Sequence, residues 1–205
     1  MEIHGYGEDA LTLWALKNRL PAILEKLDDK SSASECKALF RPSFGRSGGE
    51  NSAQFGEFDF ILFGKEQLYL GESKWHRSSE NIRDGNLDLR EEQKLRHKIF
   101  RFYVEEWAFG GHPPWPEFEK TAANRLRAQG IHKPIAPGGS LLATNLQTVL
   151  SLIKQHFETR PPIRNILLYL YYGSSEYLLP KSAGQGFEII NIDCSEGITE
   201  NFVVL

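Results

Sequence analysis

Three charged residues stand close together in the stretch EFDFILFGKEQLYLGESKW, which spans residues 57–75. Asp59 lies inside the apolar run FDFILF, and Glu72 and Lys74 lie at the end of the run LYLGESK. Two apolar runs around a short polar break predict two antiparallel strands with a tight turn at Gly64-Lys65-Glu66. Carboxylates and a lysine are unusual in buried strands, but together they can bind a divalent cation and assist hydrolysis by water.

The expected turn also fixes which residues face one another. If the turn is centred between Lys65 and Glu66, Asp59 lies directly opposite Glu72, with β-carbons about 5 Å apart. Lys74 follows two positions after Glu72 and therefore lies on the same face of the hairpin. A shift of one residue would separate the three side chains, so their shared face is a prediction of this register.

Opposed carboxylates repel each other, so a positive charge is expected between them. Lys74 is one candidate, but a divalent cation satisfies the pair better, because Mg²⁺ typically binds one or two protein carboxylates and completes its shell with water and phosphate oxygens. We therefore expect Mg²⁺ or Mn²⁺ as the cofactor. Asp59 and Glu72 would be metal ligands, and the carbonyl of Ser73 would add a third. Lys74 would orient or deprotonate the attacking water.

The composition is that of an ordinary globular chain. The 205 residues are 40% hydrophobic and 25% charged, and the net charge of −3 neither predicts nor excludes binding to nucleic acid. Cys36 and Cys194 lie far apart and outside any CxxC pattern, and no HxxxH pair occurs, which argues against a zinc site or an iron–sulfur cluster. Because the first residues do not resemble a signal peptide and no apolar run approaches roughly 20 residues, we expect a cytoplasmic protein that does not enter membranes.

Hydrophobic periodicity and breaker residues predict the other elements. Helices are predicted for residues 8–20, 21–27, 87–107, 117–129 and 143–157. Strands are predicted for residues 35–42, 58–63, 67–73, 164–172 and 187–194, and residues 43–56 are predicted to form an exposed loop. This order predicts an α/β fold, in which helices cover both faces of a central sheet. We expect a single domain over residues 1–205, with a Pro/Gly-rich helical insertion at about 109–140.

Asp59 on one strand and Glu72-Ser73-Lys74 on the next, in the order helix, three strands, helix, strand, resemble the PD-(D/E)XK phosphodiesterase superfamily. The resemblance covers roughly the first 108 residues and the strand around Leu167. It implies a restriction-endonuclease-like core, with a central mixed sheet flanked by helices, and metal-dependent hydrolysis of phosphodiester bonds, in DNA more than in RNA. In this family the acids bind the catalytic metal and the lysine assists the nucleophile. Many members add a glutamate from the first helix, which Glu8 matches, whereas Phe58 replaces the proline of the family name.

Simpler interpretations remain open at this point. Asp59, Glu72 and Lys74 are also consistent with a partly exposed hairpin face, and Glu8 is favourable at a helix N-terminus without any catalytic role. The alternative function is a catalytically inactive nuclease fold that serves as a nucleic-acid-binding or assembly module. A third possibility is an unrelated protein in which the motif is accidental.

Candidate nucleic-acid contacts lie outside the hairpin. The predicted helix 87–107 carries Lys94 and His97 on a basic stripe, and Gln93 is a polar candidate from the same helix. Arg46 lies in the Gly/Ser-rich loop and could hold a phosphate. A solvated helix face, on which acidic neighbours pair with these bases, is the alternative.

Two further features bear on the substrate and the assembly. Trp75, His76 and Arg77 directly follow Lys74, and they could stack on a base or cap the site, although Trp75 is as easily explained as a core residue. A homodimer is expected if the protein cuts both strands of a duplex.

Overall fold

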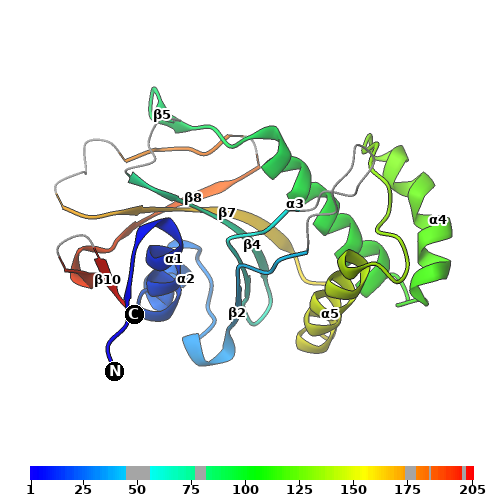
Figure 1. The fold of residues 1–205 in the computed structure, drawn as a ribbon, viewed down its shortest axis with the longest axis horizontal. Coiled ribbons are helices and arrows are strands. Elements are labelled where there is room, and N and C mark those ends of the chain that lie inside the picture. Colours follow the sequence, from blue (N-terminus) through cyan, green and yellow to red (C-terminus); the bar gives the residue numbers. More distant parts are fainter. Residues whose placement is uncertain (45–55, 77–81, 174–178, 185, 200–201) are drawn as a thin grey trace. The chain divides into compact units, whose positions relative to one another are not determined.

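The computed structural model of the chain describes residues 1–44, 56–76, 82–173, 179–184, 186–199 and 202–205 (Figure 1). The chain forms two compact units. The first unit comprises Met1–Arg41, Phe58–Arg90 and Pro162–Leu205, and the second comprises Pro42–Glu57 and Glu91–Pro161. Within the described ranges, no helix is long and apolar enough to cross a membrane.

The first unit contains a mixed sheet, which has five strands in the described part of the chain, in the order β2-β3-β4-β7-β8 (Figure 1). Its strands are β2 (Lys37–Phe40), β3 (Phe60–Phe63), β4 (Leu68–Trp75), β7 (Ile163–Tyr171) and β8 (Glu188–Asp193). The β2–β3 and β3–β4 pairs are antiparallel, whereas the β4–β7 and β7–β8 pairs are parallel. The α/β class predicted from the sequence is confirmed, and each predicted strand is found at nearly its predicted position.

Two helices precede the sheet in the chain. These are α1 (Gly7–Asn18) and α2 (Leu20–Lys26), and the proline predicted to interrupt the helical segment lies in the first turn of α2. Gly7 starts α1 with a φ of 84°, a left-handed conformation that residues with a side chain rarely adopt. Directly before α1 the chain forms β1 (His4–Gly5). This strand belongs to a small sheet with β9 (Ile198–Thr199) and β10 (Phe202–Val204).

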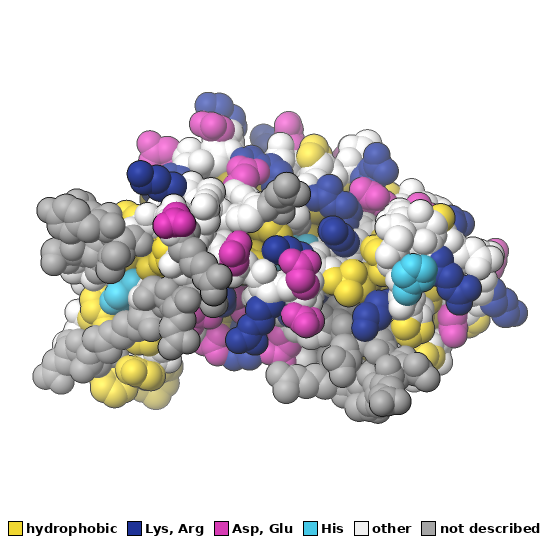
Figure 2. Space-filling model, turned by 90° about the horizontal axis from the view of Figure 1, so that it is seen from above, with side chains coloured by type: hydrophobic (Ala, Val, Ile, Leu, Met, Phe, Trp, Pro, Cys, Tyr) yellow, Lys and Arg dark blue, Asp and Glu magenta, His cyan; other side chains and the backbone are white. Residues whose placement is uncertain are grey.

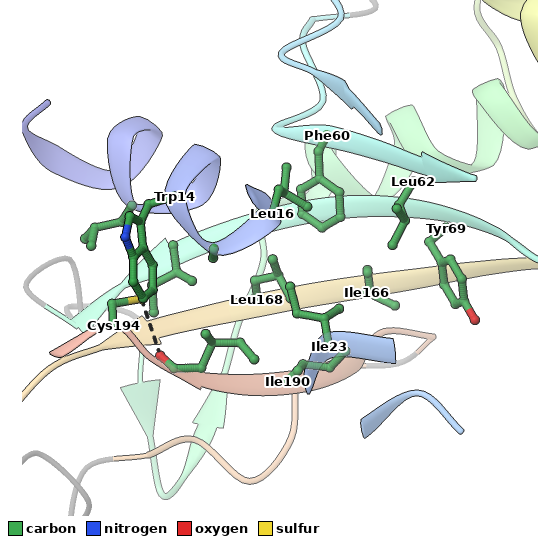
Figure 3. Packing of buried hydrophobic residues seen from close by; sticks show 14 of the residues in the cluster. Trp14, Leu16, Ile23, Phe60, Leu62, Tyr69, Ile166, Leu168, Ile190 and Cys194 are labelled. Atoms are coloured by element: carbon green, nitrogen blue, oxygen red, sulfur yellow. Dashed lines mark hydrogen bonds between the residues drawn. The ribbon is translucent and has the colours of Figure 1, made fainter. Parts of the chain in front are cut away.

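Side chains on β7 divide between the two faces of the sheet. Ile166 and Leu168 belong to the larger apolar cluster, in which Trp14 of α1 and Ile23 of α2 pack over the strands (Figure 3). Leu167 lies on the opposite face of the sheet. There, a smaller cluster forms with the following buried residues of the first unit: Leu87, Leu89, Tyr169 and Ala183. Within this unit, α1 and α2 therefore cover one face, and extended segments cover part of the other.

The register of the β3–β4 hairpin is the one predicted. Phe60 lies opposite Gly71, and Phe63 lies opposite Leu68. The turn is closed by the Gly64 amide, which donates to the carbonyl of Gln67 at 2.9 Å. The ring of Phe60 lies so close over Gly71 that a β-carbon at position 71 would be 2.1 Å from its Cζ.

One boundary differs from the prediction in a way that matters for the site. Asp59 was predicted inside a strand, but β3 begins at Phe60 and Asp59 lies in a bend just before it. The physical reason is local: a side-chain oxygen of Asp59 accepts the Ser73 amide of the neighbouring strand. The side chain thereby replaces a backbone partner where the regular ladder ends.

The second unit is helical. Its helices are α3 (Glu91–Tyr103), which continues into a π-helical turn at Val104–Ala108, α4 (Trp115–Ala128) and α5 (Leu141–His156). The helix predicted from residue 87 thus begins four residues later than expected. Residues Asn86–Leu87 instead form β6, which pairs with β5 (Ile82–Arg83), and Leu87 is buried on the sheet of the first unit.

Residues 109–140, predicted as an insertion, belong to this second unit and pack against α3. The ring of Tyr103 stacks on that of Trp115, with centroids 5.7 Å apart and an interplanar angle of 7°. The Tyr103 hydroxyl accepts the amide of Ala136 at 2.9 Å, and the indole nitrogen of Trp115 donates to the carbonyl of the same residue at 2.8 Å. The segment therefore shares a core with α3.

Candidate active site

The predicted acids converge where β3 begins and β4 approaches its end. Asp59 Oδ2 accepts the Ser73 amide at 2.6 Å. Glu72 is the residue that the observed register, continued by one position, places opposite Asp59, and it is only 1% exposed. Because side chains alternate along a strand, Glu72 points away from the face that α1 covers, whereas the ammonium group of Lys74 reaches Glu8 of α1. The structure thus places the Asp59 carboxylate at the amide of the residue after Glu72, close enough for the charge of Glu72 to affect its pKa.

Lys74 lies beside these acids and is held in place by two oxygens. Its Nζ donates to Oε1 of Glu8 at 3.1 Å and to the carbonyl of Ser73 at 2.6 Å. The side chain is 19% exposed, so the ammonium group is mostly shielded from water. Partial burial strengthens its interaction with nearby anions.

Glu8 reaches the site from the first turn of α1. One of its carboxylate oxygens binds Lys74, and the other accepts the amide of Trp75 at 2.8 Å. The left-handed Gly7 turns the chain into the helix directly before this residue. The glutamate predicted from the first helix is therefore brought to the lysine of the hairpin.

The electrostatics of the cluster are dominated by negative charge. Burial, followed by the neighbouring charge of Glu72, raises the pKa of Asp59 to about 7, and Glu8 adds a smaller effect in the same direction. The Ser73 amide and the Lys74 ammonium oppose this shift without cancelling it. The raised pKa of Asp59 therefore comes mainly from burial and, second, from the negative charge of Glu72. A cation placed between Asp59 and Glu72 would restore the ionised form of Asp59.

Asp59 and Glu72 could hold a small divalent cation together with water. Among the described residues, no cluster of three or more His, Cys, Asp and Glu side chains is arranged to hold a metal. Mg²⁺ does not require such a cluster, because it commonly uses one or two carboxylates and otherwise water and phosphate oxygens. Asp59 and Glu72 meet that requirement, and the Ser73 carbonyl, although it already accepts Lys74, retains a second lone pair.

Arg41 is a further neighbour of the site. Its amide donates to the carbonyl of Asp59 at 2.9 Å, and its guanidinium group pairs with Asp9, the residue after Glu8. Its φ of 47° is unusual for an arginine. The side chain is 44% exposed and so offers positive charge to solvent beside the acids. The local sequence does not predict this ion pair, because Asp9 lies on α1 and Arg41 follows β2.

The predicted nucleic-acid contacts have different outcomes. Arg46 lies outside the described residues. Gln93 and Lys94 lie on α3 and are half-buried, and Lys94 pairs with Glu91 at 2.8 Å, as the solvated-face interpretation expects. His97 is only 1% exposed, so it does not present its ring to solvent, because α3 turns this position inward along with Phe100.

The charge on the visible surface is mixed. On the face drawn in Figure 2, Lys and Arg side chains lie among Asp and Glu side chains. This agrees with the net charge of −3 and does not favour a mode of binding that depends on a broad basic surface.

Comparisons of the chain with protein-family models, with curated proteins and with solved structures gave no match. The functional interpretation therefore depends on the geometry of the cluster formed by Glu8, Asp59, Glu72 and Lys74.

Proposed function

We propose that this protein is a divalent-metal-dependent phosphodiesterase that hydrolyses nucleic acid, with DNA as the preferred substrate, on a restriction-endonuclease-like core. The observation that carries the proposal is the pair formed by Asp59 and Glu72, two acids held together in a largely buried setting beside Lys74. Two ionised carboxylates placed side by side repel each other, and a divalent cation between them would relieve that repulsion.

The side chains have distinct roles in this proposal. Asp59 and Glu72 would hold Mg²⁺ or Mn²⁺, which, when bound, supplies a Lewis acid that stabilises charge on the phosphate and makes water more acidic. Lys74 would donate a hydrogen bond to the attacking water or to a phosphate oxygen, since its Nζ already lies within hydrogen-bonding distance of the Ser73 carbonyl. Glu8 would act as a positioning residue that holds Lys74 through its carboxylate.

A second candidate is a fold of the same kind that binds nucleic acid or assembles with other subunits without cutting. The observation that favours it is the contact of Lys74 with both Glu8 and the Ser73 carbonyl, which occupies the ammonium group. Substrate binding would have to compete with these contacts before Lys74 could assist a water molecule.

Cleavage assays with matched variants test the proposal. Purified protein is incubated with plasmid, with single- and double-stranded oligonucleotides and with RNA, in Mg²⁺, in Mn²⁺ and in a chelator. We expect strand breaks that require the metal and that disappear in Asp59→Ala, Glu72→Gln and Lys74→Ala. The control variants are Asp88→Ala, at an exposed position, and Lys65→Ala, whose surface ion pair with Glu35 contributes little to stability.

Each outcome of the assay has a clear meaning. Cleavage that survives Asp59→Ala or Lys74→Ala contradicts the assignment of the site. Absence of cleavage, together with binding of nucleic acid that does not respond to metal, supports the second candidate. Equal cleavage by the wild type and by all variants would point to a contaminating nuclease, and loss of cleavage in the control variants would show that the effect is not specific to the site.

A further inference from the structure

Five rings cluster at the carboxyl ends of β4 and β7. We call this cluster the aromatic platform; its members are Tyr6, Trp75, His76, Tyr172 and Phe202. Trp75 lies at its centre, with its ring centroid 5.9 Å from that of Tyr6 at an interplanar angle of 88°, and 6.3 Å from that of Tyr172. The rings of His76 and Tyr172 meet edge to face at 4.4 Å.

The outer part of the platform is open to solvent. Tyr6 is 61% exposed and Phe202 is 46% exposed, and their rings lie 5.9 Å apart. Trp75 is half-buried and packs against the main apolar cluster, so it forms a fixed base beneath the exposed rings. Large aromatic side chains left together on a surface are typical of binding sites, because each contributes apolar area that water would otherwise cover.

The platform is joined directly to the acidic cluster. The carboxylate of Glu8 holds Lys74 with one oxygen and the amide of Trp75 with the other, at 3.1 and 2.8 Å. Tyr6 is the residue at which the chain enters α1, only two positions before Glu8. A molecule bound through a phosphate at Lys74 would therefore have aromatic rings within reach of the group next to that phosphate.

We infer that the aromatic platform binds an unpaired nucleobase beside the phosphate to be cut, so that the substrate is single-stranded nucleic acid or a splayed-out strand. This inference rests on the proposed hydrolytic function. A nucleobase is the flat, apolar group that lies beside a phosphate in every nucleic acid, and stacking on Tyr, Trp or Phe accepts all bases. In a duplex the faces of the bases are covered by their neighbours, so only an unpaired base can use these rings.

The charge on the face drawn in Figure 2 is compatible with this substrate. A protein that binds duplex through many phosphates needs clustered basic residues, whereas acidic and basic side chains are interspersed on the face in Figure 2. Stacking provides affinity that does not depend on a broad positive surface.

Fluorescence with a defined probe tests the inference separately from catalysis. A short single-stranded DNA that contains 2-aminopurine, and its RNA counterpart, are titrated with protein in a chelator, where cleavage cannot occur. We expect quenching of the probe on binding, and an affinity lowered about 5- to 100-fold in Tyr6→Ala and in Phe202→Ala. Tyr6→Phe, which keeps the ring, should bind within about twofold of the wild type. Leu152→Ala, which removes an exposed apolar side chain from the second unit, should behave in the same way.

The outcomes separate this inference from the proposed function. Wild-type protein that quenches the probe in a ring-dependent way but cuts nothing supports the platform and contradicts the hydrolytic function. Metal-dependent cleavage that Tyr6→Ala and Phe202→Ala leave unchanged on single strands supports hydrolysis and overturns the platform. If Tyr6→Ala and Phe202→Ala instead lower the molecular mass of the protein in solution relative to the wild type, and leave binding of the probe unchanged, the rings form a contact between copies of the protein and the inference is overturned. Thermal melts of all variants verify that each is folded.

Discussion

Two acids, Asp29 and Asp59, contact the same strand, β4, and their surroundings differ sharply. Asp29 follows α2 and accepts three hydrogen bonds: from the amide and hydroxyl of Ser31 at 2.7 and 2.5 Å, and from the hydroxyl of Tyr69 at 2.6 Å. Burial alone would raise the pKa of Asp29, but these donors outweigh it and the pKa is lowered. Asp59 has the Ser73 amide as a donor, but burial and then the nearby charge of Glu72 raise its pKa to about 7.

The difference separates Asp29, which stabilises the fold, from Asp59, which we propose to bind a cation. Asp29 is surrounded by donors, so its charge stabilises the local structure. Asp59 is surrounded partly by negative charge, so its ionisation costs stability unless a cation is supplied. The same side chain, against the same strand, is therefore expected to respond in opposite ways to substitution.

The largest expected difference between the two acids is in activity. Asp59→Asn should lower metal-dependent hydrolysis by about 10³-fold or more, because it removes a charge from the proposed metal site. Asp29→Asn should retain activity within about threefold when rates are compared per folded molecule. Initial rates on a labelled oligonucleotide measure both. Equal losses of activity in Asp59→Asn and Asp29→Asn would contradict different roles for the two acids.

Metal binding gives the next largest difference. A cation that binds only the folded protein raises the free energy of unfolding by about 2.7 kcal/mol at a hundredfold excess over its Kd. We therefore expect Mn²⁺ to raise the Tm of the wild type and of Asp29→Asn, and to leave the Tm of Asp59→Asn unchanged. Differential scanning fluorimetry with and without chelator measures this shift, and Ca²⁺ serves as a control cation that need not support cleavage. A shift that persists in Asp59→Asn would place the cation elsewhere.

Loss of the structural acid should weaken the fold by a smaller amount. Asp29→Asn is expected to lower the free energy of unfolding by about 1–2 kcal/mol at neutral pH, because charged hydrogen bonds are lost in a partly exposed setting. Since the pKa of Asp29 is lowered in the folded state, this contribution is complete above its ordinary pKa and is lost as the pH falls through the folded value. Urea unfolding at neutral pH and at about pH 3 should show the difference shrinking in acid. Asp28→Asn, at an exposed position with a φ of 54° that asparagine tolerates, is the matched control and should change little.

Substitution of Asp59 should change the free energy of unfolding least, and should raise it where Asp29→Asn lowers it. In a chelator at about pH 8, Asp59→Asn is expected to be more stable than the wild type by about 1 kcal/mol, because it removes the repulsion with Glu72. A raised pKa means that the wild type is stable with the proton bound and loses stability as the pH rises through about 7, so the gain should fade toward about pH 5. A destabilised Asp59→Asn at high pH would show that the carboxylate is already satisfied.

The hairpin and its acids could be predicted because the information is local. The turn after Phe63 and the alternation of apolar residues set the register, and that register pairs Phe60 with Gly71, the neighbours of Asp59 and Glu72. The first unit's α/β order followed from periodicity in the same way. The predicted strand that contains Asp59 begins two residues too early, because sequence patterns do not show where a side chain will replace a backbone partner.

The rest depended on contacts between segments far apart in the chain. Glu8 and Trp75 are 67 residues apart, and no periodicity reports that one carboxylate would hold both Lys74 and the next amide. The inward direction of His97 on α3 was missed because a basic stripe was assumed to face solvent, whereas tertiary packing decides which side of a helix is buried. The exposed ring of Phe202 came close to that of Tyr6 only through the pairing of β10 with β1.

The close approach of Phe60 to Gly71 has a consequence for how the site can evolve. Gly71 leaves room for the Phe60 ring, so a side chain at position 71 would force the ring or the strand to shift directly beside Asp59 and Glu72. Gly71, which has no reactive group, therefore affects the positions of Asp59 and Glu72. A homologue with alanine at position 71 would keep Asp59, Glu72 and Lys74 in its sequence, but we expect their positions relative to one another to change.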